Sequence, residues 1–116
     1  RGEKMATDAS LFSGSMTMLV LKLLEEKDMY GYEMIDTLCR KSNNVFEMKA
    51  GTLYPLLHTL VKQKCLESYE KEVNGKTRKY YRLTAVGKKL LETKQKVWRE
   101  YSEAVVDIIG GAPNEA

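Results

Sequence analysis

The chain has 116 residues, of which 43% are hydrophobic and 30% are charged, and its formal net charge is +3. This length suits a single domain with one core and leaves little room for an enclosed active site. No apolar run approaches the roughly 18 residues of a membrane span and no signal peptide is recognisable, so we expect a cytoplasmic protein without membrane contact.

Two helices are predicted before residue 45. Residues 1–10 are polar and small, and we expect a flexible tail there, with Met5 as the native start. Apolar residues spaced three and four apart predict a helix over about 13–26, which the turn at 28–31 ends. A second amphipathic helix is predicted over about 31–42, where polar turn residues stop it.

Two cysteines, Cys39 and Cys65, lack the CxxC spacing of metal and redox sites. Each lies in an amphipathic pattern, as small buried hydrophobic residues do. We therefore expect no metal and no cofactor.

The third predicted helix begins in an unusual stretch, KAGTLYPLLHTLVKQK at residues 49–64. Thr52 as the N-cap would place Pro55 in the first turn, where a missing N–H group costs little. Leucines at helical spacing form the buried side. On the opposite side Tyr54, His58 and Lys62 are four residues apart and are expected to form one exposed ridge.

An Asn-Gly pair at 74–75 is the strongest short-range signal for a β-hairpin, because a type I′ turn needs positive φ at both central residues. The two-residue loop fixes the register of strands at 66–73 and 76–83, and most facing pairs are complementary. Lys71, however, falls directly opposite Arg78. A bound phosphate group between these like charges would relieve their repulsion; the alternative is a solvated hairpin with its long side chains splayed apart.

From Thr84, a natural N-cap, a helix is predicted to run to about Ile109. At about 1.5 Å per residue it is roughly 39 Å long, more than the body of so small a domain covers. Its apolar stripe predicts a seam between two copies of the chain in a C2 dimer. The expected dimerisation residues are Leu90, Leu91, Val97, Trp98, Tyr101, Val105 and Ile108. In the alternative arrangement the first helix folds back and covers part of this stripe.

Basic residues concentrate in the middle of the chain: residues 49–82 carry 8 basic and 3 acidic side chains, whereas residues 1–48 carry 6 and 8. Three helices, a hairpin and a long helix are the order of a winged helix-turn-helix, whose third helix enters the major groove of DNA. We therefore expect a mainly α fold with a small β-hairpin. Residues 11–83 would bind DNA, 84–110 would form the dimerisation helix and 111–116 a tail.

Three motifs are MYGYEM at 29–34, GTLYPLLHTLVKQKCLES at 51–68 and TRKYYRLTAVGKKLL at 77–91. In this order and spacing they closely resemble the PadR family of bacterial transcriptional regulators. The resemblance implies a homodimeric repressor that binds an inverted repeat in double-stranded DNA. The chain is similar in length to the short-armed members, and this likeness implies a planar aromatic effector between two copies of Trp98. In the alternative, the tryptophan only packs the dimer.

Twelve side chains are candidate DNA contacts. Helix N-termini favour phosphate, and lysine or arginine side chains favour it elsewhere, whereas Tyr54 and His58 suit base edges or sugars. The candidates are Tyr30, Tyr32, Lys49, Thr52, Tyr54, His58, Lys62, Lys71, Asn74, Lys76, Arg78 and Lys79. In the alternative interpretation, His58 is an exposed residue without a special role, and one of Tyr30 and Tyr32 belongs to the core.

Two other classes of function compete with DNA binding. A winged-helix module that docks on an acidic protein partner is the main alternative, and salt-sensitive binding to a preferred duplex sequence would separate the two. An enzyme is not expected, because the sequence has no phosphate-binding loop, nucleophile elbow or clustered carboxylate pair. His58, the only histidine, lacks partners for a catalytic triad or a zinc site.

Overall fold

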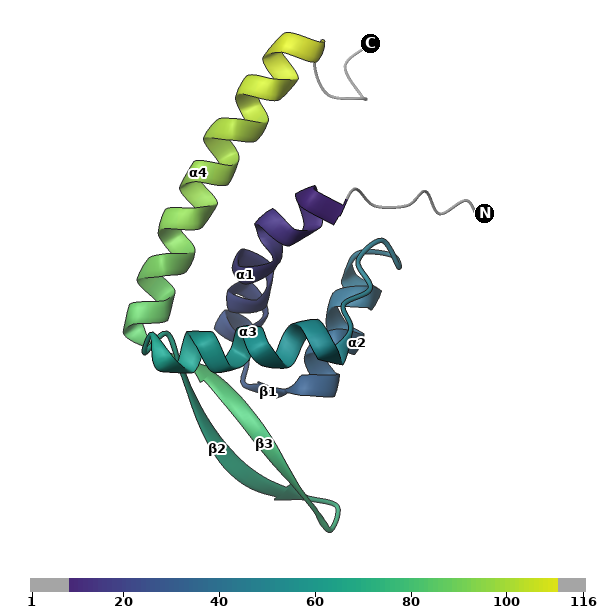
Figure 1. Cartoon of the computed structure of the whole chain (residues 1–116), viewed down its shortest axis with the longest axis vertical. Coiled ribbons are helices and arrows are strands. Elements are labelled where there is room, and N and C mark those ends of the chain that lie inside the picture. The colour runs from purple at the N-terminus through teal and green to yellow at the C-terminus, as the bar shows by residue number, and fades with distance from the viewer. Residues whose placement is uncertain (1–8, 111–116) are drawn as a thin grey trace.

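Helices dominate the structure, and one small antiparallel sheet lies among them (Figure 1). The computed structural model describes residues 9–110. Its elements are α1 Ala9–Glu26, β1 Met29–Tyr30, α2 Gly31–Lys41, α3 Ala50–Lys62, β2 Leu66–Val73, β3 Lys76–Leu83 and α4 Ala85–Ile109. This confirms the expected fold class. α1 begins earlier than the predicted residue 13, so residues 9–10 of the tail predicted at 1–10 are helical. Residues 1–8 and the tail predicted at 111–116 lie outside the described residues.

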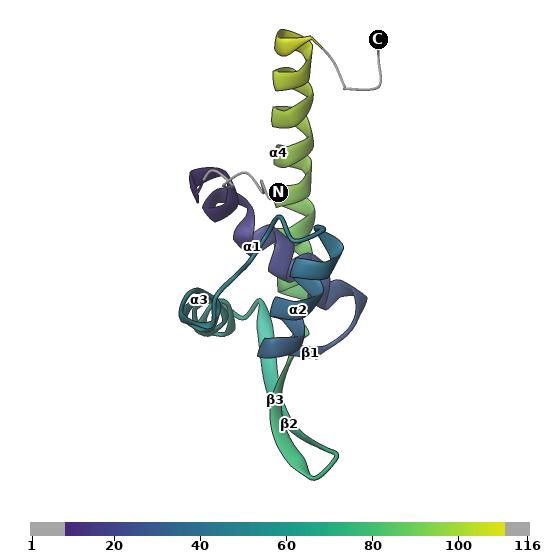
Figure 2. The same cartoon turned by 90° about the vertical axis from the view of Figure 1, so that its right-hand side faces the viewer.

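One core lies between α1, α2, α3, the base of α4 and the sheet. Leu21 of α1, Leu53 and Leu57 of α3 and Leu91 of α4 have no exposed surface. Each such leucine contributes about 1.5–3 kcal/mol by leaving water. The core holds α3 at the edge of the body, where Figure 2 shows it end-on, while the C-terminal part of α4 extends beyond the other helices.

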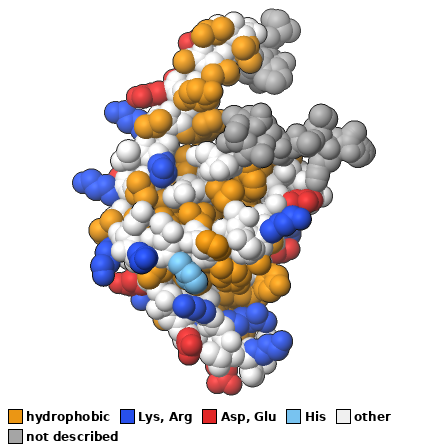
Figure 3. All heavy atoms as spheres, in the orientation of Figure 1, with side chains coloured by type: hydrophobic (Ala, Val, Ile, Leu, Met, Phe, Trp, Pro, Cys, Tyr) orange, Lys and Arg blue, Asp and Glu red, His pale blue; other side chains and the backbone are white. Residues whose placement is uncertain are grey.

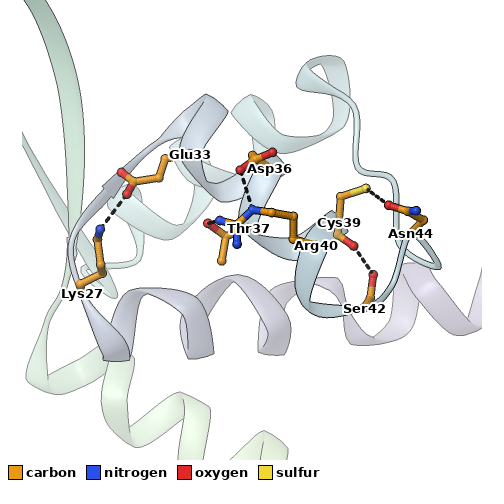
Figure 4. A network of polar contacts seen from close by, with 8 residues as sticks. All are labelled: Lys27, Glu33, Asp36, Thr37, Cys39, Arg40, Ser42 and Asn44. Atoms are coloured by element: carbon orange, nitrogen blue, oxygen red, sulfur yellow. Dashed lines mark hydrogen bonds and ion pairs between the residues drawn. The ribbon is translucent and has the colours of Figure 1, made fainter.

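Polar contacts tie α2 at both ends (Figure 4). Before the helix, Lys27 pairs with Glu33 at 2.9 Å. After it, the Cys39 thiol donates to Asn44 Oδ1 at 3.1 Å. Cys39 is therefore half-exposed and hydrogen-bonded, which corrects the expectation of a buried thiol, whereas Cys65 is buried as expected.

The hairpin has the predicted register, with Lys71 opposite Arg78 and a turn at 74–75 in which both residues have positive φ. The structure adds a strand that sequence reasoning missed. β1 pairs with β3, with Met29 opposite Tyr81, and gives the sheet order β1-β3-β2. A strand of two residues has no periodicity of its own, so the segment was interpreted only as a break.

Pro55 lies inside α3, and this corrects the predicted start of the helix. Lys49 is the N-cap and no side chain caps the helix, so Thr52 is not the cap. The first turn is tight, because the N–H of Thr52 donates to the carbonyl of Lys49 at 3.0 Å, an i to i+3 bond. Pro55 offers no N–H to the carbonyl of Gly51, four residues earlier. Gly51 is exposed, so that carbonyl faces water rather than the core.

α4 is fastened to the start of β2 by Thr84, its N-cap as predicted. The Thr84 hydroxyl accepts from the N–H of Gly87 at 3.0 Å. The same hydroxyl donates to the carbonyl oxygen of Lys64 at 2.6 Å, and it lies 3.0 Å from that of Cys65, which also accepts from the N–H of Thr84 at 3.1 Å. At the other end Gly110 stops the helix with φ of 111°. The base of α4 is therefore fixed to the body by both the side chain and the backbone of Thr84.

Thr84→Ala is expected to lower the free energy of unfolding by about 1–2 kcal/mol, because the helix loses its cap and the Lys64 carbonyl loses its hydroxyl donor. Urea unfolding monitored by circular dichroism measures the change. Thr84→Ser keeps the hydroxyl and is the matched control. Equal stability of the alanine and serine variants would contradict the proposed role of the hydroxyl.

Candidate nucleic-acid interface

α3 buries one side and exposes the other. Leu53, Leu57 and Leu60 face the core. The exposed side consists of Gly51, Thr52, Pro55, His58, Thr59, Lys62 and Gln63. Figure 3 shows the only histidine, His58, on the surface toward the viewer. Within residues 9–110, His58 and Lys62 have no hydrogen-bond or ion-pair partner, so both are available to a ligand.

Tyr54 does not join this exposed side. Its ring is half-buried against the core, and its hydroxyl end covers Gly31, where a Cβ atom would collide with it. The predicted ridge is therefore wrong in its first member: His58 and Lys62 are exposed, whereas Tyr54 fills the space between α2 and α3. This contact joins two helices, so the spacing within α3 does not reveal it.

α2 and α3 both begin without a side-chain cap. Their N-caps are Tyr30 and Lys49, which have extended backbone and no capping hydrogen bond, in contrast to Thr84 before α4. Free N–H groups at a helix N-terminus, together with the macrodipole, favour a phosphate. Tyr32, with 66% of its surface exposed, and the exposed Lys49 flank these two N-termini.

The β2–β3 hairpin, called the wing below, has two different faces. Because side chains alternate along a strand, Lys71, Lys76 and Arg78 share the outer face. Lys79 lies on the inner face, with Tyr81, which is buried in the core. The four predicted wing cations therefore form two surfaces rather than one, joined by the exposed turn at 74–75.

Tyrosine rings separate the like charges that face each other in the wing. Lys71 Nζ lies 5.2 Å from the centre of the Tyr80 ring, and the Arg78 guanidinium carbon lies 4.3 Å from that of Tyr30. Each cation–π contact contributes about 0.5–1 kcal/mol at a solvated site. The pair is thus accommodated within the chain, and a phosphate is not needed to explain it. Of the two candidate tyrosines, Tyr30 belongs to this cluster and Tyr32 is exposed.

Two more tyrosines of the sheet have raised pKa values. A hydrogen bond from the Tyr69 hydroxyl to Asp28, 2.6 Å long, raises the pKa of Tyr69. Burial raises the pKa of Tyr81. Both phenols stay protonated and neutral at neutral pH, so neither offsets the positive charge of the lysine and arginine side chains of the wing. Arg82 adds little of it, since it contacts Glu67 at 3.4 Å.

A model of the PadR-like family of transcriptional regulators matches residues 20–93, which run from the C-terminal part of α1 through α2, α3 and the wing to the start of α4. The chain belongs to the PadR-like family. This confirms the resemblance seen in the motifs and makes the protein a DNA-binding transcriptional regulator, not an enzyme.

Individual relatives match over most of their length. A protein of Lysinibacillus sphaericus is 37% identical over 98 residues, 84% of this chain and 90% of its own. The transcriptional regulator Rv3488 of Mycobacterium tuberculosis is 31% identical over 75 residues, 65% of this chain and 67% of its own. The crystal structure of a PadR family regulator from Eggerthella lenta has a TM-score of 0.76 at 32% identity and covers 90% of this chain and 89% of that one.

One part of the apolar stripe of α4 packs into the body of this PadR-like protein, and the other part is exposed. Leu91 is fully buried in the core, so it cannot meet a second copy, which corrects its assignment as a dimerisation residue. Leu90 packs half-buried beside it, and α1 lies against this part of α4, as in the folded-back alternative. Farther along, the exposed members are Val97, Trp98, Tyr101 and Ile108. Figure 3 shows hydrophobic side chains continuing along the protruding helix.

Trp98 stacks on Tyr101, with ring centres 6.3 Å apart, and lines a groove between α1 and α4. Glu100, Glu103 and Asp107 are exposed and do not line this groove. An acidic partner for a cationic ligand is therefore not supplied by these three side chains within the protomer.

Sequence reasoning missed the α1 side of the groove. Gly14, Ser15 and Met18 form it. The one sequence signal for this side of the groove was Gly14, a glycine within a predicted helix. In a helix that begins at residue 13, this glycine would lie in the first turn. Because α1 begins at Ala9, Gly14 instead lies in the second turn, where glycine is unfavourable.

Proposed function

We propose that this PadR-like protein is a cytoplasmic, homodimeric repressor that binds an inverted repeat in double-stranded DNA and is released by a planar aromatic effector beside Trp98. Residues 11–83 would bind DNA and residues 84–110 would hold the dimer together. The observation that carries the proposal is the exposed side of α3, where His58 and Lys62 lack partners within the described chain. This polar surface continues to an uncapped N-terminus.

Each group of candidate contacts has its own task in this proposal. His58 and Thr52 meet base edges or sugars in the major groove, and Lys62 meets a phosphate. Lys49 and Tyr32 add to the phosphate sites at the starts of α3 and α2. Tyr54 acts indirectly by holding α3 against α2.

The wing would meet the backbone that flanks the major-groove contacts. Asn74 at the exposed tip approaches the minor groove, and Lys79 on the inner face binds a phosphate. Lys71, Lys76 and Arg78 do the same on the outer face. A guanidinium stacked on a ring keeps its edge N–H groups free, so the contact of Arg78 with Tyr30 is compatible with this role.

Two features of α4 support the dimer. Val97, Tyr101 and Ile108 expose 59%, 58% and 84% of their surface, and apolar side chains in a row on a protruding helix favour a partner. Residues 85–99 carry five basic side chains and one acidic, whereas residues 100–109 carry three acidic and no basic. Antiparallel pairing of two copies would bring opposite charges together, and parallel pairing would oppose like charges.

The test is selection of bound sequences from random duplex DNA. We expect an inverted-repeat consensus, because each protomer of a C2 dimer reads one half-site. Ile108→Glu is the matched variant: it places a charge at the apolar seam while residue 108 is too exposed to affect the fold. This variant should be monomeric and should recover half-sites at most. Recovery of no preferred sequence by the unmodified protein would contradict DNA recognition.

A further inference from the structure

Asn74 differs from the other asparagines of the described chain in the freedom of its surroundings. Residues 9–110 contain three asparagines, Asn43, Asn44 and Asn74, and all three have positive φ. Backbone conformation therefore does not set Asn74 apart. It lies with Gly75 at the exposed tip of the wing, which projects away from the helices (Figure 1). Its side-chain amide has no hydrogen-bond partner within residues 9–110, whereas that of Asn44 accepts from the Cys39 thiol.

The backbone nitrogen after each asparagine is the group that can attack the side-chain amide. After Asn43 and Asn44, the N–H groups of Asn44 and Val45 donate to carbonyl groups at the end of α2, at 2.8 and 3.1 Å. The N–H of Gly75 donates to no acceptor in the described chain, because the bonds of a two-residue hairpin turn close between the flanking residues. Even a Cβ atom added to Gly75 would meet nothing within 4 Å. The nitrogen after Asn74 is therefore both free and unhindered.

The charge of the wing favours an attack by this nitrogen. Residues 71–79 carry four basic side chains and one acidic. A deprotonated backbone nitrogen and the tetrahedral intermediate that it forms are both anionic, so nearby cations stabilise them. Lys76 follows Gly75 directly and has no ion-pair partner among the described residues. The tip thus combines a free nucleophile, an accessible amide and a favourable electrostatic field.

We propose that Asn74 is a site of spontaneous deamidation, and that the negative charge it gains loosens the wing from DNA. The deprotonated nitrogen of Gly75 forms a bond to Cγ of Asn74. The bond from Cγ to Nδ2 breaks, and ammonia leaves with a proton taken from water. Water then opens the cyclic succinimide, at Cγ to give aspartate or at the backbone carbonyl carbon to give isoaspartate. Both products carry a carboxylate in place of the neutral amide.

The hairpin tip gives the reaction both its opportunity and its effect. Ring closure requires the torsions of Asn74 to leave the type I′ turn, and an exposed tip opens at little cost in free energy. Aspartate keeps the turn, because Asp-Gly is also favoured there. Isoaspartate lengthens the backbone at the turn, so the register of the wing is no longer fixed. The chemistry stands by itself, whereas its effect on DNA rests on the proposed function.

Ageing of the full chain in warm, mildly alkaline buffer tests the chemistry. Peptide mass spectrometry should find aspartate and isoaspartate at position 74, at a rate proportional to hydroxide concentration. We expect Asn74 to react at least about tenfold faster than Asn43 or Asn44, since a hydrogen bond on the attacking nitrogen alone accounts for roughly that factor. An intact Asn74 amide, faster loss at Asn43 or Asn44, or aspartate without isoaspartate would overturn the inference.

Asn74→Asp isolates the effect of the charge, since it keeps the turn. It should weaken duplex DNA binding about tenfold, because each wing of a dimer places a carboxylate within a few ångströms of a phosphate. Asn44→Asp is the matched control: it adds the same charge beyond the end of α2, and an aspartate oxygen there still accepts from the Cys39 thiol. Unchanged binding by Asn74→Asp, or the same loss in Asn44→Asp, would refute the effect on DNA.

Asn74→Gln connects the chemistry to the effect. Its longer side chain closes a larger ring more slowly, so its affinity for duplex DNA, whatever its starting value, should not decline on ageing. The affinity of the unmodified protein should fall at least to that of Asn74→Asp. A parallel decline in both proteins would refute Asn74 as the cause. Duplex binding by the fresh protein is measured first: its absence refutes the proposed function and the effect on DNA, while the mass spectra still decide the chemistry.

Discussion

Raising the salt concentration from 50 to 200 mM is expected to weaken duplex DNA binding by roughly 10³- to 10⁵-fold. The estimate applies to a dimer that makes about six to ten phosphate contacts, each of which releases a condensed counterion. Those contacts would come from both copies of Lys49, Lys62 and the wing cations, which lie in the segment with 8 basic and 3 acidic residues. Fluorescence anisotropy of a labelled duplex at several salt concentrations measures the effect.

Lys62→Gln sharpens this experiment. Two copies of a phosphate-binding lysine account for a slope of about 1.8 in the plot of log affinity against log salt, at about 0.9 per contact. The variant should lose that part of the slope. Lys22→Gln is the control, because Lys22 lies on α1 and pairs with Glu25 at 2.8 Å. A salt slope near zero for the unmodified protein would exclude the phosphate contacts altogether.

Gly87→Ala is expected to lower the free energy of unfolding by about 2–3 kcal/mol, as overpacking of a tight contact does. A Cβ atom at this position would collide with the carbonyl oxygen of Cys65 and the side chain of Leu83. The carbonyl group of Cys65 belongs to the backbone and cannot rotate away as a flexible side chain does. The base of α4 must therefore move away from β2. Thr84, which binds the same carbonyl, would lose its geometry in the same step.

The control for this experiment is a second glycine-to-alanine change in a helix. Gly14→Ala meets no atom within 4 Å and should raise stability by about 0.5–1 kcal/mol through helix propensity. Urea unfolding of the two variants should therefore give changes of opposite sign. A Gly87→Ala protein as stable as the unmodified one would show that α4 does not need its close approach to Cys65.

Local chemistry made several elements predictable from the sequence. The Asn-Gly pair at 74–75 needs no distant partner to form its turn, so the register of the wing followed from it. Thr84 and Gly110 mark the ends of α4 in the same way, since a cap depends only on its own helix. Periodic apolar residues placed α2 within one position of its ends, whereas the N-cap of α3 lies three residues before the predicted one.

Features that depend on contacts between elements were not predictable. β1 exists only because β3 lies beside it, and Tyr54 is half-buried only because Gly31 leaves space for its hydroxyl end. The stripe of α4 contained both Leu91, which packs into the body, and Tyr101, which is exposed. Spacing along a helix does not say which part of a stripe meets its own chain. The candidate DNA residues were therefore found more readily than the groove, whose two sides are far apart in sequence.

The fastening of Thr84 to Lys64 and Cys65 has a consequence for the geometry of a dimer. α3 ends at Lys62, two residues before the first of these carbonyls, and α4 begins one residue after the threonine. The end of α3, the helix that we propose faces DNA, and the base of α4 are therefore joined by one short connection. A tilt of the protruding helix against its counterpart would turn both α3 helices at once. The separation between two half-sites would thus be set at this joint, remote from every base that the protein reads.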